Sequence, residues 1–102
     1  MLTPIARTDH PEAREVVAST HCVLRFRERH PIRAPGGAAV MSELLAVLEE
    51  ADVSGWPPGW AVGDRPARLW AVAGDLAFPL EPTGLPGRWV AVTCLKRGSR
   101  GR

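Results

Sequence analysis

Four side chains with complementary chemistry lie close together in the first third of the chain: His21, Arg25, Glu28 and Arg29. If this segment is a helix, residues three and four apart are neighbours on its surface, and the four side chains form one contiguous polar stripe. A histidine exchanges a proton near neutral pH and can act as a general base or acid. Arginines carry a fixed positive charge and suit the binding of phosphoryl oxygens. The combination is typical of a site that acts on phosphate esters.

Cleavage of RNA through its 2′-hydroxyl needs such a set of groups and no metal ion. A base removes the hydroxyl proton, the oxygen attacks phosphorus, an acid protonates the leaving oxygen, and cations stabilise the phosphoryl charge. We expect His21 to be the catalytic base, and Glu28 to be the second proton-transfer group or to orient an arginine. Arg25 and Arg29 are expected to bind phosphate. An alternative stays open, because surface helices also pair Glu with Arg for solubility and local stability alone.

The sequence predicts that this stripe lies on a helix over residues 21–30. Ser19 and Thr20 are both good N-cap residues, of which Thr20 is taken as the cap, and the helix ends before Pro31. At 3.6 residues per turn, the apolar side faces the core and consists of Cys22, Val23, Phe26 and the ring of His30. A second helix is predicted over residues 43–51 with Ser42 as its cap, after a loop over residues 32–39. Its apolar positions have helical spacing and are Met41, Leu44, Leu45 and Leu48.

The second half of the chain has residue patterns that are typical of β-strands. Residues 69–72 and 76–80 flank Gly74 and Asp75, a plausible hairpin connection, and Pro79 indicates a sheet edge or a strand end. Residues 88–95 form the strongest strand pattern and include Thr93. Because helices precede strands, we expect an α+β fold in which two N-terminal helices pack on a three- to four-stranded antiparallel sheet. The prediction is a single domain over residues 1–102, with residues 1–12 and 97–102 irregular or mobile.

Composition narrows the range of functions only slightly. The formal net charge is +2, and Lys96 is the only lysine among the basic residues. This use of arginine fits phosphate recognition, but it also fits a GC-rich coding sequence, since Ala, Gly and Pro are plentiful as well. Cys22 and Cys94 are expected to be buried free thiols, and no cofactor or metal site is expected. No apolar run approaches the roughly 18 residues of a membrane span, and no signal peptide is evident, so a cytoplasmic location without membrane contact is expected.

Four tryptophans divide into two pairs. Trp70 and Trp89 lie in predicted strands and are expected in the core. Trp56 and Trp60 flank a Pro-Pro-Gly turn and are the better candidates for the surface. An exposed tryptophan can stack on a nucleic-acid base or anchor a protein interface, and it can also simply cover a corner of the core.

The segment from His21 to Arg29 resembles the helix His-Ala-x-x-Arg-x-x-x-Arg of small bacterial ribonuclease-toxin domains in the barnase, EndoU, colicin and RelE-like group. The final strand of that group reads Val-x-Thr-Val/Leu, and Val92-Thr93-Cys94-Leu95 is similar to it. The resemblance covers residues 19–29 and 67–97, and it leaves residues 32–66 without a counterpart. A second histidine that is catalytic in some branches of the group also has no clear counterpart.

This resemblance implies a RelE- or barnase-like fold, a metal-independent endoribonuclease activity and a cognate antitoxin as a partner. It assigns catalysis to His21 and phosphate contacts to Arg25 and Arg29. It also assigns to Thr93 a hydrogen bond to phosphate or to His21. Two other functions remain open. One is a non-catalytic protein-binding module, such as a phage- or operon-encoded inhibitor or regulator that binds through Trp56 and Trp60. The other is an RNA-binding domain without catalysis.

Overall fold

A computed structural model describes residues 4–30, 36–61 and 67–98 of the chain. The elements in chain order are β1 (Ala6–Arg7), β2 (Glu15–Ala18), α1 (Thr20–Arg29), α2 (Gly37–Glu50), β3 (Asp52–Ser54), β4 (Leu69–Ala73), β5 (Leu76–Pro82), β6 (Arg88–Ala91) and β7 (Leu95–Lys96). Most of the loop predicted before the second helix and the end of the basic tail, residues 31–35 and 99–102, lie outside the described residues.

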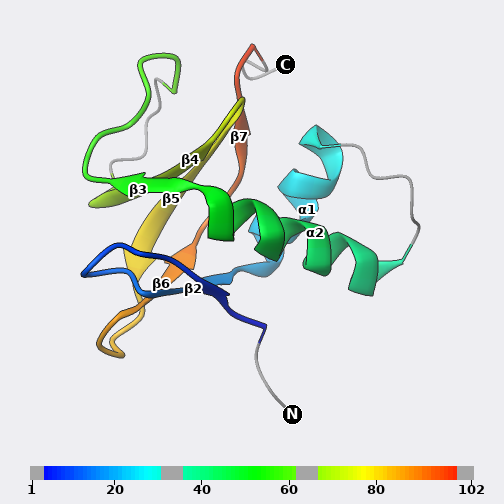
Figure 1. The fold of residues 1–102 in the computed structure, drawn as a ribbon. Coiled ribbons are helices and arrows are strands. Elements are labelled where there is room, and N and C mark those ends of the chain that lie inside the picture. The colour runs from blue at the N-terminus through cyan, green and yellow to red at the C-terminus, as the bar shows by residue number, and fades with distance from the viewer. Residues whose placement is uncertain (1–3, 31–35, 62–66, 99–102) are drawn as a thin grey trace.

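All the strands belong to one curled, mixed sheet (Figure 1). Its order is β1-β2-β6-β5-β4-β3, and β7 pairs with β5 beyond the end of β6. Most neighbours are antiparallel, but β2 and β6 are parallel, with Val16 opposite Trp89. The predicted architecture, two N-terminal helices on a three- to four-stranded antiparallel sheet, is therefore wrong. Two strands precede α1, a third separates α2 from β4, and the pairing of β2 with β6 joins segments far apart in the sequence.

The two faces of the sheet carry two hydrophobic clusters of different size. Helices α1 and α2 cover one face, where their buried side chains meet those of β4, β5 and β6. The main cluster includes Phe26, Leu44, Leu48, Phe78, Leu80 and Trp89. The opposite face holds a smaller cluster around Trp70 and Ala77, against which Trp60 packs from the loop after β3. Alternate residues of β4 and β5 point to opposite clusters, as the two-residue period of a strand requires.

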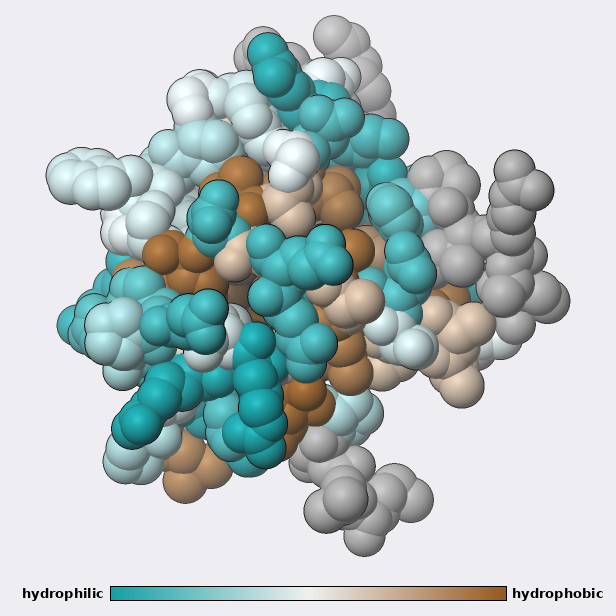
Figure 2. All heavy atoms as spheres, viewed as in Figure 1, coloured by the Kyte–Doolittle hydropathy of each residue, from teal (hydrophilic) through white to brown (hydrophobic). Residues whose placement is uncertain are grey.

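The helices begin earlier than predicted. Ser19, not Thr20, caps α1, because the Ser19 side chain accepts a hydrogen bond from the backbone N–H of Cys22. Helix α2 begins at Gly37, and Ser42 lies within it rather than at its cap. Gly36 precedes the helix with a φ of 108°, a conformation that glycine adopts without strain. The predicted loop at residues 32–39 therefore includes the first turn of α2. Figure 2 shows hydrophilic residues spread over the face that α2 presents, with hydrophobic residues visible between them.

The predicted strand over residues 88–95 is interrupted by a β-bulge. Leu80 of β5 lies opposite Ala91, and Ala77 lies opposite Leu95. Three steps along β5 therefore lie opposite four steps along the segment from Ala91 to Leu95. Residues 92–94 thus contain one residue more than residues 78–79, which face them. Beyond the bulge the alternation is shifted by one residue. Cys94 therefore joins the main cluster beside Ala91, while Leu95 packs on the opposite face.

Pro79 lies opposite this bulge. Its carbonyl accepts a hydrogen bond of 3.0 Å from the N–H of Val92, and it has no N–H of its own to continue the ladder. The prediction of an edge position or a strand end for Pro79 is wrong, because β5 has β4 on one side and β6 and β7 on the other. A proline inside a sheet is tolerated at a bulge, where the ladder is already broken.

An ion-pair cluster joins the end of β1 to the starts of β2 and β6. Nε and Nη2 of Arg88 donate to Oε1 of Glu15 at 3.1 and 3.0 Å, and Nη1 of Arg7 donates to Oε2 at 3.1 Å. The hydrogen bonds from Arg88 are the main cause that lowers the pKa of Glu15. A carboxyl group whose pKa is lower in the folded state stabilises the fold above its unfolded pKa. That contribution is lost as the pH falls through the folded pKa.

Replacing Glu15 by glutamine is therefore expected to lower the free energy of unfolding at pH 7. The difference from wild type should shrink as the pH falls and the wild-type carboxyl group becomes protonated. Urea unfolding of both proteins between pH 7 and about pH 3 measures this difference. Glu49→Gln, an exposed position on α2, serves as the control and should show no such trend. A deficit that stays constant with pH would contradict the assigned role of the Glu15 charge.

Candidate functional site

The N-terminus of α1 is held against the bulge by Ser19. The Ser19 backbone N–H donates to the carbonyl of Ala91 at 3.1 Å, and the Ser19 hydroxyl donates to the carbonyl of Val92 at 2.9 Å. The same hydroxyl accepts the N–H of Cys22 at 3.0 Å and so caps the helix. A single serine therefore starts α1 and fixes it to the segment that contains Thr93. The bulge allows this contact, since residues 92–94 do not continue the ladder of β6.

His21 lies on the first turn of α1, two residues after this anchor, and its side chain is exposed. Within the described part of the chain its imidazole makes no hydrogen bond or ion pair. Arg25 follows one turn later, about 6 Å along the helix axis at 1.5 Å per residue. Its Nη1 donates to Oε1 of Glu28 at 2.8 Å, and both side chains are partly open to solvent. The predicted stripe of His21, Arg25 and Glu28 is thus present on the surface of α1.

Thr93 lies in the bulge rather than in a strand, and it is half-buried. Because its neighbour Val92 accepts the hydroxyl of Ser19, its backbone lies at the same end of α1 as His21. The hydroxyl of Thr93 makes no hydrogen bond within the described residues. The sequence placed this threonine in the interior of a strand. The structure places it at a break in the ladder, a position where bulges commonly direct side chains toward functional sites.

Arg29 ends α1 on the side that faces β7. Arg29 and Lys96 of β7 line one pocket. Burial raises the pKa of the Cys94 thiol to about 12, while the positive charges of Arg29 and Lys96 act in the opposite direction. Both cations therefore lie near Cys94, at the far end of α1 from His21. The segment of residues 92–96 runs beside α1, with the Ser19 contact at one end and the Arg29–Lys96 pocket at the other. We call the surface formed by His21, Arg25, Arg29, Thr93 and Lys96 the α1–bulge surface.

The two cysteines lie beneath this surface as buried free thiols, as predicted. Burial, followed by the neighbouring Cys94, raises the pKa of the Cys22 thiol to about 12. A thiol with so high a pKa is neutral at physiological pH and is a poor nucleophile. The cysteines therefore serve packing between α1 and the bulge.

The other two histidines are committed elsewhere. The ring of His30 stacks on Phe26 with centroids 4.9 Å apart, and its Nε2 lies 3.5 Å from Oε2 of Glu43 on α2. His10 lies between β1 and β2, where its Nδ1 accepts the N–H of Glu12. Neither histidine is on the α1–bulge surface beside His21. The sequence shows no clear counterpart for a second catalytic histidine, and the described surface around His21 contains none either.

The tryptophans follow their predicted division only in part. Trp70 and Trp89 are buried, as predicted, and the indole N–H of Trp89 donates to the carbonyl of Glu12 at 2.9 Å. Trp56 is 81 % exposed, whereas Trp60 packs against the smaller cluster. Both belong to the segment after β3, which follows α2 in the chain. Of the predicted surface pair, only Trp56 presents most of its ring to solvent.

Lys96 and Ser19 were not assigned to the site from the sequence. Lys96 belongs to the site because β7 pairs with β5 beside the end of α1. The local sequence pattern does not predict this pairing between distant segments. Ser19 was recognised as a good capping residue, but its bond to Val92 depends on the bulge. A proline inside an otherwise apolar strand was the one local signal of that bulge.

Neither helix in the described ranges combines the length and apolar character needed to cross a bilayer. Within the same ranges, no three His, Cys, Asp or Glu side chains are grouped so that they could hold a metal ion. Comparison with protein-family models, curated proteins and solved structures gave no match, so the α1–bulge surface is interpreted from its own geometry.

Proposed function

We propose that this chain is a metal-independent, toxin-like endoribonuclease that binds and cleaves RNA on the α1–bulge surface. One observation carries the proposal. An exposed histidine with no partner among the described residues lies on the first turn of a helix that is bonded to the Thr93 segment, with Arg25 one turn away. Two further cations, Arg29 and Lys96, continue this arrangement toward the other end of the helix. The resemblance of residues 21–29 to the helix of ribonuclease toxins supports the same proposal, although the RelE- or barnase-like fold that it implied is contradicted by the mixed sheet.

The proposed reaction begins with His21 as a general base. The imidazole removes the proton of an RNA 2′-hydroxyl, and the freed oxygen forms a bond to the adjacent phosphorus. The bond from phosphorus to the 5′-oxygen breaks, which leaves a 2′,3′-cyclic phosphate and a 5′-hydroxyl end. Arg25 stabilises the negative charge that develops on the phosphoryl oxygens, and Thr93 donates a hydrogen bond to the same group.

Glu28 was a candidate for the second proton transfer. Its ion pair with Arg25, at 2.8 Å, favours the other assigned role, orientation of the guanidinium group toward phosphate. No second histidine lies beside His21, so the leaving oxygen takes its proton from solvent water in this proposal. A reaction with one positioned base and no positioned acid is expected to be slow, since each such group contributes about 10²- to 10⁴-fold.

Trp56 favours a second candidate function, a protein-binding module. A tryptophan that is 81 % exposed on a small domain is a typical anchor residue of a protein interface. The two functions are compatible, because a ribonuclease toxin of the cytoplasm needs a protein that restrains it. A cognate antitoxin or a host protein bound at Trp56 would leave the α1–bulge surface on a separate part of the chain.

The test is incubation of the purified chain with end-labelled RNA in EDTA, beside DNA of the same sequence. We expect shortened RNA with cyclic phosphate ends, and intact DNA, because DNA lacks the 2′-hydroxyl. RNA that is shifted in a gel but not shortened would overturn catalysis and support RNA binding alone. Intact and unshifted RNA would overturn both and leave the protein-binding function.

A further inference from the structure

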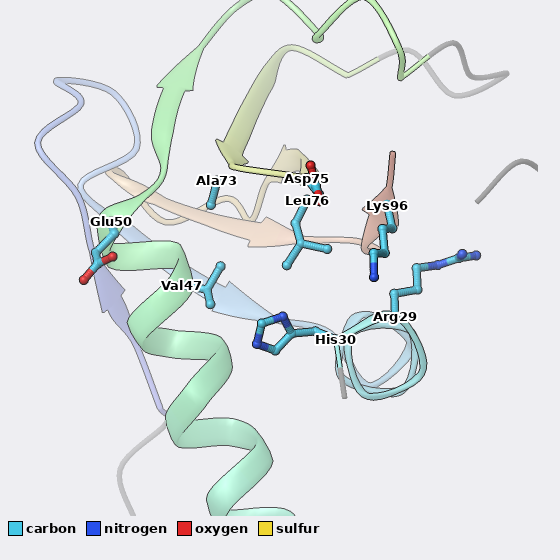
Figure 3. Close-up of a pocket in the computed structure, with 8 residues that line it drawn as sticks. All are labelled: Arg29, His30, Val47, Glu50, Ala73, Asp75, Leu76 and Lys96. Atoms are coloured by element: carbon cyan, nitrogen blue, oxygen red, sulfur yellow. The ribbon is translucent and has the colours of Figure 1, made fainter. Parts of the chain in front are cut away.

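A pocket of about 270 Å³ lies at the C-terminal end of α1, where α1, α2, the β4–β5 turn and β7 meet (Figure 3). Its wall combines apolar and charged groups. Val47 and Leu76 supply aliphatic surface, His30 supplies an aromatic ring, and Arg29 and Lys96 supply positive charge. The volume is sufficient for a single planar ring system with its attached sugar partly outside. Nothing in the reaction at His21 uses this pocket.

The His30 ring is fixed from two sides. One face stacks on Phe26 at an angle of 19°, and Nε2 is held 3.5 Å from Glu43. The side chain nevertheless remains 38 % exposed, and it borders the pocket. In Figure 3 the ring lies opposite Leu76, with Val47 to one side. A rigid, half-exposed aromatic ring facing aliphatic side chains provides a place where a planar group can insert and stack.

The charged groups at the rim indicate what kind of ligand fits. Lys96 extends toward the space beside His30 in Figure 3, whereas the carboxylate of Glu50 points away from it. Asp75 lies at the other wall. Carboxylates at the rim disfavour a bare phosphate inside the pocket, while the apolar wall favours an uncharged ring. Lys96 can still contact a phosphate attached to that ring at the mouth, and Arg29, whose guanidinium group points away from His30 in Figure 3, adds positive charge nearby.

The pocket lies along the same helix as the proposed catalytic base. His21 and Arg29 are eight residues apart, which corresponds to about 12 Å along the helix axis. This separation is comparable to one or two nucleotides of an extended strand. His30 stacks on buried Phe26, on the side of α1 opposite to His21. An RNA strand whose scissile phosphate lies at His21 and Arg25 therefore reaches His30 by passing around the C-terminal end of α1.

We infer that this pocket is a nucleobase subsite, in which one base of the RNA stacks on His30 against Val47 and Leu76 while Lys96 holds its phosphate, with the positive charge of Arg29 nearby. The inference takes RNA as the ligand from the proposed function, but it does not require catalysis. It predicts that binding depends on the base at one position of the strand, a few nucleotides from the cleaved bond.

The test uses a short 2′-O-methyl RNA, which cannot react, in a set of oligomers that each carry one abasic residue. Fluorescence anisotropy measures their affinity for wild type and for Val47→Trp, in which an indole fills the pocket. For wild type, one abasic position is expected to weaken binding about five- to hundredfold, the usual effect of losing one stacked base. Val47→Trp should bind the intact oligomer as weakly as wild type binds the oligomer with that abasic position. In this variant the abasic position should cause no further loss of affinity.

Ala46→Trp is the matched control, because it adds the same indole to the neighbouring, exposed position of α2. It should bind as wild type does, and thermal unfolding of all three proteins checks that they are folded. Equal loss at every abasic position, or equal binding by Val47→Trp and wild type, would overturn the subsite. RNA cleavage by wild type, measured in parallel, separates the two proposals. Cleavage without a special abasic position overturns only the subsite, and a special position without cleavage overturns only the catalysis.

Discussion

Replacing His21 by asparagine is expected to lower the rate of RNA cleavage by about 10²- to 10⁴-fold, the contribution of a positioned proton-transfer group. Asparagine keeps a polar side chain of similar reach but cannot remove a proton from the 2′-hydroxyl. RNA affinity should change little, because the positive charges of Arg25, Arg29 and Lys96 remain. The loss is therefore expected in kcat, with KM nearly unchanged. Single-turnover cleavage of a labelled oligomer in EDTA measures the rate directly.

The exposed position of His21 makes this variant interpretable. Its side chain has no partner within the described residues, so its replacement should leave the midpoint of thermal unfolding within about a degree or two. His10→Asn, a change of the same type in the loop between β1 and β2, is the control and should cleave at the wild-type rate. A wild-type rate in His21→Asn would mean that another group is the base, or that a contaminating nuclease cuts the RNA.

Arginines of the same surface should affect binding rather than the chemical step alone. Each cation that contacts a phosphate contributes about one unit to the slope of log affinity against log salt concentration, slightly less for single strands. This dependence links the two proposals, since Arg29 belongs to both the stripe on α1 and the pocket at its end. The small net charge of the whole chain is compatible with RNA binding. Local clustering of arginine on one helix determines the field that the strand meets.

The parts of the fold that depend on local patterns were predictable from the sequence. Helix α1 appeared with its apolar side toward the core, because Cys22 and Phe26 recur at helical spacing and both are buried. The β4–β5 hairpin appeared because Gly74 and Asp75 interrupt two apolar runs, and Gly74 has the positive φ that such a turn requires. Trp70 and Trp89 appeared in the core for the same reason, their place in extended apolar segments.

The parts that depend on distant pairing were not predictable. Strand β2 contains only four residues, and it is stabilised by β6, whose Arg88 is 73 residues from Glu15. Strand β3 has only three residues, too few to show a pattern of alternation. Short strands of this kind form because a neighbouring strand offers its hydrogen-bonding edge, not because their own residues favour an extended chain. The sequence pattern therefore predicted helices followed by strands, and it missed β1 and β2 before α1 and β3 after α2.

The same limit applied to the candidate site. Its residues on α1 were visible from their spacing, because a single helix positions them all. Their relation to Thr93 was expected only from a resemblance. This relation depends on the bulge, which the pattern of residues 88–95 alone does not predict. A one-residue shift in register reverses which side chains face the core, and so Cys94, rather than Thr93, follows Trp89 and Ala91 into the main cluster.

The integrity of this surface depends on the packing of α1, and Phe26 is the residue that controls it. The ring is fully buried and contacts both His30, at 4.9 Å, and Phe78 of β5, at 6.5 Å between centroids. Replacing Phe26 by alanine removes these contacts and leaves a cavity between α1 and the sheet. We expect a loss of about 3–5 kcal/mol in the free energy of unfolding, the usual range for a buried phenylalanine. Since small domains are stable by about 5–15 kcal/mol, this is a large part of the total.

Urea unfolding followed by tryptophan fluorescence measures the loss, because Trp70 and Trp89 are buried in the folded sheet. Leu24→Ala is the matched control on the same helix, since Leu24 is 55 % exposed and its truncation should cost no more than about 0.5 kcal/mol. Equal losses at the two positions would show that α1 does not pack on the sheet through Phe26. In that case α1 would not hold His21 beside the bulge or His30 in the pocket wall, because both positions depend on the same helix being seated by that ring.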